Sequence, residues 1–125
     1  GDEEACGNSR SCIVNVWRSI AGVVEQKPLA FLANSRHAWP SSREVPGVSQ
    51  QGFQVGRSQF LSFAPWHRWI VFPSMQPEEA IVFKTFDSAD IHGAFFHTAL
   101  DDNDTAIDAS IRESIEVRAI CVWKD

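Results

Sequence analysis

The chain has 125 residues, of which 44% are hydrophobic, with 5 Trp, 9 Phe and no Tyr, so it can bury one packed core and is not a disordered chain. Its formal net charge of −5 leaves no broad basic surface for a nucleic-acid backbone. No apolar run approaches the roughly 20 residues that span a bilayer, so we expect neither a membrane nor a nucleic acid as partner.

Short strands separated by turn residues follow one another along the chain, after a flexible lead-in over 1–10. β-Branched and aromatic runs predict strands at 12–20, 27–34, 53–63, 67–73, 80–86, 93–100 and 111–123. Pro, Gly and Ser residues predict a long loop at 35–52, and acidic residues predict a second loop at 101–110. A Pro-Glu-Glu sequence predicts one helical turn at 77–79. The strand 53–63 is expected to pair with 67–73 as a hairpin. The pattern predicts a single all-β domain over 11–125, a sandwich or barrel with short helical turns.

The last predicted strand has one polar face. Side chains alternate along a strand, so Arg112, Ser114, Glu116 and Arg118 share a side. The commoner explanation is a solvated outer face. The other is an inward-facing Arg-x-Ser pair, because the guanidinium fork binds a carboxylate through two hydrogen bonds.

His97 is a candidate metal ligand on the preceding strand. An antiparallel return could bring its imidazole near the arginine face, and imidazole with a carboxylate suits non-haem iron. A lone histidine is more often a packing or rim residue. A third option is a two-histidine site formed by His92 and His97 with Asp90.

The stretches "NVWRSI", "KPLAFLANSR", "HRWIVFPSMQPEEAIVFKTFDS", "FHTALDD" and "RESIEVRAICVW" occur in this order over residues 13 to 123. This arrangement resembles the AsaB-like or CmcJ-like hydroxylase/desaturase family, which includes gibberellin-desaturase-like proteins. The resemblance implies a double-stranded β-helix, or jelly roll, that binds Fe(II) and 2-oxoglutarate and oxidises a small secondary metabolite by hydroxylation or desaturation.

The resemblance also implies roles for individual residues. By position, His97 looks like the distal iron ligand. Arg112, with Ser114 as helper, looks like the clamp on the distal carboxylate of 2-oxoglutarate, and Arg118 is the alternative clamp. Asn15 and Trp17, on the first predicted strand, are expected to line the same pocket. No residue is assigned as a catalytic acid or base.

One part of the family pattern does not occur in this sequence. The His-x-Asp pair that supplies two iron ligands is absent, and "HRWIVF" stands where the family has two tyrosines. We therefore expect the C-terminal part of an oxygenase, inactive as an isolated chain and completed by a homodimer or by a missing N-terminal half. The alternative is a non-catalytic β-sandwich that binds a small carboxylate or a protein partner.

The expected compartment is the cytoplasm. Three cysteines, an odd count without metal-binding spacing, fit reduced thiols, and the acidic first residues carry no secretory signal.

Overall fold

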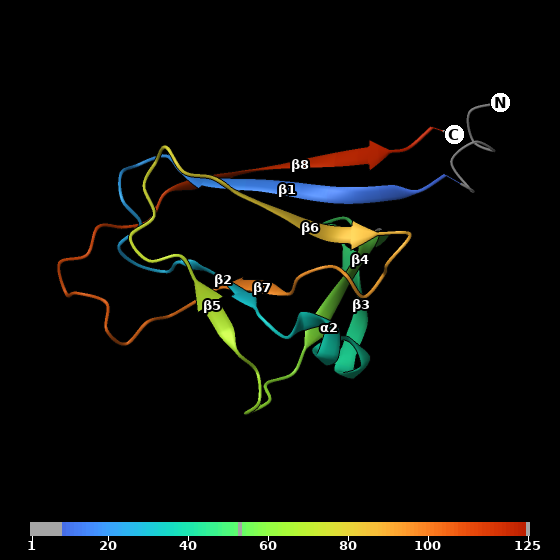
Figure 1. Cartoon of the computed structure of the whole chain (residues 1–125), viewed down its shortest axis with the longest axis horizontal. Helices are drawn as coiled ribbons and strands as arrows, with labels where there is room; N and C mark the ends of the chain where they lie inside the picture. The colour runs from blue at the N-terminus through green and yellow to red at the C-terminus, as the bar shows by residue number, and fades with distance from the viewer. Residues whose placement is uncertain (1–8, 53, 125) are drawn as a thin grey trace.

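The computed structural model describes residues 9–52 and 54–124, which form strands and one short helix (Figure 1). The strands are β1 (Ser11–Ser19), β2 (Leu29–Leu32), β3 (Ser42–Val48), β4 (Gln54–Leu61), β5 (Trp69–Val71), β6 (Ile81–Asp87), β7 (His97–Ala99) and β8 (Ser114–Val122). The helix α2 (Ser35–Ala38) continues into a 3-10 turn, η1 (Trp39–Ser41). The strands form two three-stranded sheets, β6-β1-β8 and β5-β2-β7, and a ribbon, β3-β4, without closing a barrel in the described residues. The all-β prediction is confirmed.

β1 is the central strand of the first sheet, and both neighbours run antiparallel to it. Asn15 lies opposite Phe83 on β6 and Arg118 on β8. The register with β6 shifts at Ile13, which leaves Thr85 as the extra residue of a β-bulge. The bulge matters for the site because it lets both Thr85 and the next residue, Phe86, line one cavity.

The inner face of this sheet carries both core residues and polar residues, whereas its outer face is largely apolar. Directly opposed residues of antiparallel strands point to the same side. The polar residues of β8 therefore share a side with buried residues of β1, in the pairs Ser19↔Ser114, Trp17↔Glu116 and Asn15↔Arg118. On the other side, Val16, Val82, Ile115 and Val117 are 36%, 66%, 50% and 58% exposed. The polar side of the last strand is thus the side on which β1 buries Trp17 and Asn15, although Glu116 and Arg118 are themselves exposed to solvent.

The hydrophobic core lies between the two sheets. Trp17 and Phe83 from the first sheet pack with Leu29 and Phe31 from the second, together with the buried Met75. The rings of Phe31 and Phe83 meet edge to face, with centroids 4.9 Å apart, a geometry that aromatic pairs favour. The core cluster therefore ties β6 to β2 across the domain.

The segment 35–52 was expected to be a loop, and this prediction is wrong. It contains α2, η1 and β3, which pairs antiparallel with β4. Pro46 and Gly47 produced the loop signal. The structure accommodates them because the β3–β4 ladder is irregular between Pro46 and Val48, where a missing N–H is tolerated.

The expected hairpin between 53–63 and 67–73 is also wrong. β4 pairs with β3, whereas β5 pairs with β2, whose other neighbour is β7. β2 is buried along its whole length. A buried strand needs hydrogen-bonding neighbours on both edges, so it recruits β5 and β7.

Two predicted strands are shorter in the structure: β8 begins at Ser114, so Arg112 precedes it, and β7 is confined to His97–Ala99. The predicted helical turn at 77–79 is a turn without a helix, in which the Glu79 N–H donates to the Gln76 carbonyl at 3.0 Å. The acidic segment 101–110 is irregular, as expected. Residues 1–8 of the predicted lead-in lie outside the described residues.

Candidate active site

His97 stands on β7 with its ring against the aromatic core. It lies opposite Phe31, and its centroid is 4.8 Å from that of Phe83. Its Nδ1 is 3.2 Å from the carbonyl oxygen of Phe95. With the proton on Nδ1, the ring donates to this carbonyl and keeps the Nε2 lone pair available. Metal-binding histidines commonly have this second hydrogen bond, which fixes both tautomer and ring orientation.

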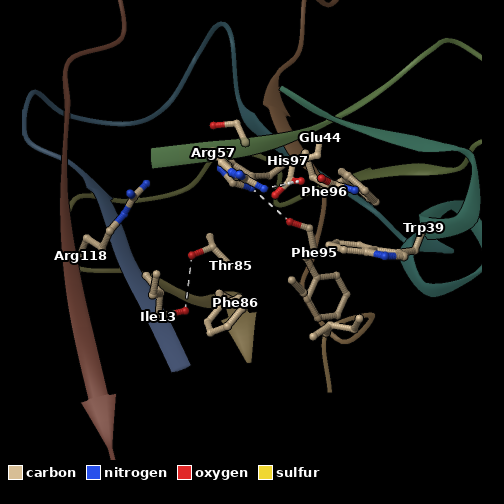
Figure 2. Close-up of a pocket in the computed structure, with 14 residues that line it drawn as sticks. Ile13, Trp39, Glu44, Arg57, Thr85, Phe86, Phe95, Phe96, His97 and Arg118 are labelled. Carbon is tan, nitrogen blue, oxygen red and sulfur yellow. Dashed lines mark hydrogen bonds and ion pairs between the residues drawn. The ribbon is translucent and has the colours of Figure 1, made fainter. Parts of the chain in front are cut away.

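His97 opens onto a cavity of about 610 Å³ between the first sheet, the β3–β4 ribbon and the segment before β7 (Figure 2). Such a volume suits a small organic ligand. Its apolar lining includes Trp39, Phe86, Ile91, Ala94, Phe95 and Phe96. Its polar lining includes Glu44, Arg57, Thr85, His97 and Arg118. An apolar wall facing a few polar groups is the usual composition of a ligand pocket.

Two arginines line this cavity in different electrostatic states. Arg57 donates from Nη1 to the Glu44 carboxylate at 3.2 Å. Arg118 has no hydrogen-bond or ion-pair partner within residues 9–52 and 54–124, and its side chain is exposed. Figure 2 shows its guanidinium extending from β8 on the side of the cavity that Thr85 also lines.

Arg112 lies elsewhere. Its Nη1 donates to the carbonyl oxygen of Lys27, and its Cζ is 5.5 Å from the centroid of the Trp17 ring. Trp17 belongs to the same core cluster as Phe31 and Phe83, whose rings contact the ring of His97. Arg112 and His97 thus contact different members of one aromatic cluster. Of the two arginines proposed as the carboxylate clamp, Arg118 lines the cavity with His97 and Arg112 does not.

Asn15 and Ser114 lie on the inner side without lining the cavity. The Asn15 side chain is fully buried; its Nδ2 donates to the Glu116 carboxylate, and its Oδ1 accepts from Thr85 Oγ1 at 3.3 Å. Because these partners satisfy its amide, Asn15 acts beneath the cavity and positions Glu116 and Thr85. Ser114 lies opposite Ser19 at the start of β8.

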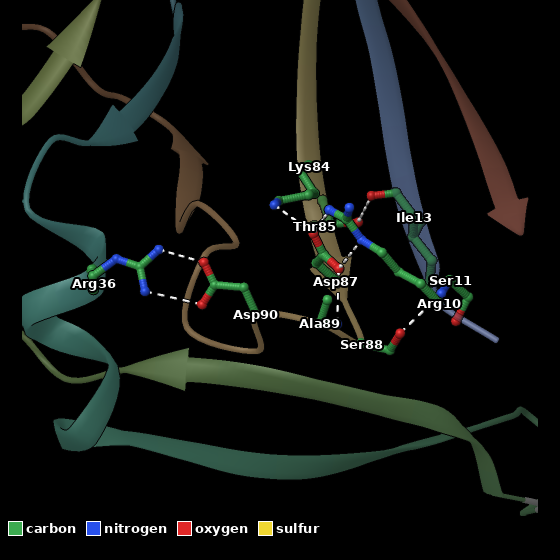
Figure 3. Close-up of polar contacts among 10 residues, drawn as sticks. All are labelled: Arg10, Ser11, Ile13, Arg36, Lys84, Thr85, Asp87, Ser88, Ala89 and Asp90. Atoms are coloured by element: carbon green, nitrogen blue, oxygen red, sulfur yellow. Dashed lines mark hydrogen bonds and ion pairs between the residues drawn. The ribbon is translucent and has the colours of Figure 1, made fainter. Parts of the chain in front are cut away.

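The two-histidine option is not favoured by the geometry. Both carboxylate oxygens of Asp90 accept from Arg36, at 3.0 and 2.6 Å (Figure 3), and the hydrogen bonds from Arg36 lower the pKa of Asp90. The His92 ring packs on Trp39 at 5.4 Å. Across the described part of the chain, no three His, Cys, Asp or Glu residues lie close enough to hold a metal ion.

Several cavity residues were missed from the sequence. Glu44 and Arg57 pair across the β3–β4 ribbon, which the loop prediction concealed. Trp39 lies in the same segment, 35–52, for which the sequence predicts only a loop.

Comparison with known proteins places these features in a wider context. A family described as an oxidoreductase/YMDC permease-like domain matches residues 2–122. Aspirochlorine biosynthesis protein N of Aspergillus oryzae is 31% identical over 93% of this chain, and oxidoreductase R1 of a Phoma species is 34% identical over 86%. The chain spans 50% and 38% of the lengths of these two relatives.

Solved structures show the same fold. The iron and alpha-ketoglutarate-dependent endoperoxidase NvfI superposes with a TM-score of 0.77 and 25% identity, covering 97% of this chain and 47% of that chain. NvfI in a different conformation gives a TM-score of 0.78 at 26% identity. The expected fold, that of the C-terminal part of an oxygenase jelly roll, is thereby confirmed. In the described residues, no helix is both long and apolar enough to span a membrane.

Proposed function

Because the chain belongs to the oxidoreductase/YMDC permease-like domain family, we propose that it is the C-terminal part of an Fe(II)- and 2-oxoglutarate-dependent oxygenase that modifies a small secondary metabolite. Support comes from NvfI, an iron and alpha-ketoglutarate-dependent enzyme of the same fold, and from a relative named for aspirochlorine biosynthesis. The proposed reaction is a hydroxylation or a desaturation of that metabolite. The cytoplasm is the proposed compartment.

The observation that carries the proposal is the setting of His97. Its Nδ1 is held by the Phe95 carbonyl, and its ring opens onto a ligand-sized cavity. We assign His97 as one iron ligand. Arg112, with Ser114, is assigned to the distal carboxylate of 2-oxoglutarate, because the bond to Lys27 uses Nη1 alone and leaves the other guanidinium nitrogens available.

The residues present do not fit a complete iron centre. An iron site of this class needs two histidines and a carboxylate on one face of the metal, and the described residues bring no such group together. We therefore expect the isolated chain to lack oxygenase activity. A second copy or an N-terminal half remains the predicted source of the missing ligands.

The test is a titration with Co(II), followed by paramagnetic shifts of the histidine ring protons, with and without 2-oxoglutarate. We expect weak binding that perturbs the His97 ring and is lost in His97→Ala but kept in His67→Ala. 2-Oxoglutarate should tighten this binding in the wild type and fail to do so in Arg112→Ala.

The alternative function is a non-catalytic module that binds a small carboxylate. It predicts 2-oxoglutarate binding that requires Arg112 but ignores both Co(II) and His97. No response to either ligand would contradict the oxygenase assignment and the carboxylate-binding module together.

A further inference from the structure

Arg118 is a cation whose surroundings leave it available for a ligand. Of the two arginines that line the cavity, Arg57 is neutralised by Glu44, whereas Arg118 has no such partner among the described residues. The guanidinium has five N–H donors in a fixed plane. An exposed guanidinium at a concave surface is therefore a ready receptor for an anion that enters the cavity.

The backbone position of Arg118 is well fixed. It lies opposite the buried Asn15 in the middle of the β1–β8 ladder. Glu116, two residues earlier on the same side, is the nearest acidic residue along the strand, but its carboxylate accepts from Asn15 and does not line the cavity. The strand thus holds the arginine at the cavity while its acidic neighbour is engaged elsewhere.

The aromatic lining of the cavity, which comes from β6 and from the segments opposite the first sheet, suits a flat apolar group. Trp39 packs on Phe96 with centroids 5.6 Å apart, and Phe86 and Phe95 line the same space. Stacked aromatic side chains bind planar or ring-containing ligands through apolar burial and ring contacts. The cavity therefore combines one available cation with an aromatic wall.

We propose that this cavity contains an anion subsite centred on Arg118, and that its ligand is an organic acid with an aromatic or other flat apolar body. The carboxylate pairs with Arg118 while the body lies against Trp39 and Phe86. The inference rests on the proposed function in one respect, since it identifies this acid as the substrate class of the enzyme. The subsite is separate from Arg112, which we assigned to 2-oxoglutarate.

The test uses 2-naphthoate and its uncharged analogue 2-naphthamide as probes of the metal-free chain, with dissociation constants measured by calorimetry. A charge-assisted pair of about 1.4 kcal/mol corresponds to a tenfold change in affinity. We expect naphthoate to bind the wild type about tenfold more tightly than naphthamide. Arg118→Gln should bring naphthoate to the naphthamide level, Arg118→Lys should fall between, and the exposed control Arg68→Gln should resemble the wild type.

The remaining outcomes overturn the proposal. Equal affinities of the wild type for the acid and the amide would remove the anion subsite. Loss of naphthoate binding in Arg112→Ala, with Arg118→Gln unaffected, would place the acid on the other arginine. Since these measurements need no metal, failure of the Co(II) titration would reject the oxygenase assignment and leave the Arg118 subsite to stand or fall by itself.

Discussion

Arg10 and Asp87 form a two-pronged ion pair where β1 begins and β6 ends. Arg10 donates to the Asp87 carboxylate from Nε at 3.2 Å and from Nη2 at 2.8 Å (Figure 3). Lys84 Nζ and the Ala89 backbone N–H also donate to it, at 2.8 and 2.9 Å. The Asp87 side chain is fully buried. Four donors to one carboxylate stabilise its charged form, and the hydrogen bond from Arg10 is the largest cause of a pKa far below the usual value of the group.

Replacing Asp87 with Asn should therefore destabilise the fold in a pH-dependent manner. A carboxyl group with a lowered pKa contributes stability above its unfolded pKa of about 3.9, and that contribution is lost as the pH falls toward the folded value. The urea midpoint of Asp87→Asn should lie well below that of the wild type at pH 7, and the gap should narrow below pH 4. Asp108→Asn, on an exposed loop, is the control. A gap that stayed constant with pH would contradict this account.

Phe83 links the core to the candidate site, so its truncation should affect both. Phe83→Ala removes a buried ring that contacts Phe31 and His97. Comparable substitutions cost about 3–5 kcal/mol, and loss of the ring should also shift the His97 ring protons in the NMR spectrum. Phe83→Leu should cost less. If the His97 resonances stayed unchanged while stability fell, Phe83 would be a core residue without influence on the imidazole.

The buried amide of Asn15 should be coupled energetically to Glu116. Asn15→Ala removes the hydrogen bonds to Thr85 and Glu116, and a hydrogen bond of this kind contributes about 0.5–1.5 kcal/mol net. Glu116→Gln keeps an acceptor for Asn15 and should cost less. A double-mutant cycle between the two positions, measured by urea unfolding, is the check; additive effects would show that the contact contributes nothing.

Some of this molecule was predictable because the signals are local. The strands 12–20 and 80–86 were placed within one residue of β1 and β6, since β-branched residues fill them. The inward orientation of the polar side of β8 was one of two hypotheses. The period of two shows which side chains of the strand share a side, but not which side faces the rest of the protein. That choice depends on Trp17 and Asn15, which are far away in sequence.

Other features depend on contacts that no local pattern encodes. Pro46 indicates a loop by composition, and only the register shift beside β4 makes it a strand residue. Arg112 and Arg118 share a strand side by periodicity. Because β8 begins only at Ser114, Arg112 lies in the irregular segment before the strand and contacts Trp17, whereas Arg118 lies within the strand and lines the cavity.

The apolar outer side of the first sheet predicts self-association of the isolated chain. Val82 and Val117 are more than half exposed there and stand near Val16 and Ile115, and contiguous apolar patches of this kind commonly mark interaction surfaces. We expect sedimentation velocity to show concentration-dependent dimers. The double variant Val82→Lys/Val117→Lys should shift the chain to monomers, because two desolvated ammonium groups would oppose burial of the face. Val48 on the β3–β4 ribbon is 65% exposed. The control variant Val48→Lys places a charge there, away from the first sheet, and should leave the dimer intact. If the two variants behaved alike, the contact surface would lie outside this sheet.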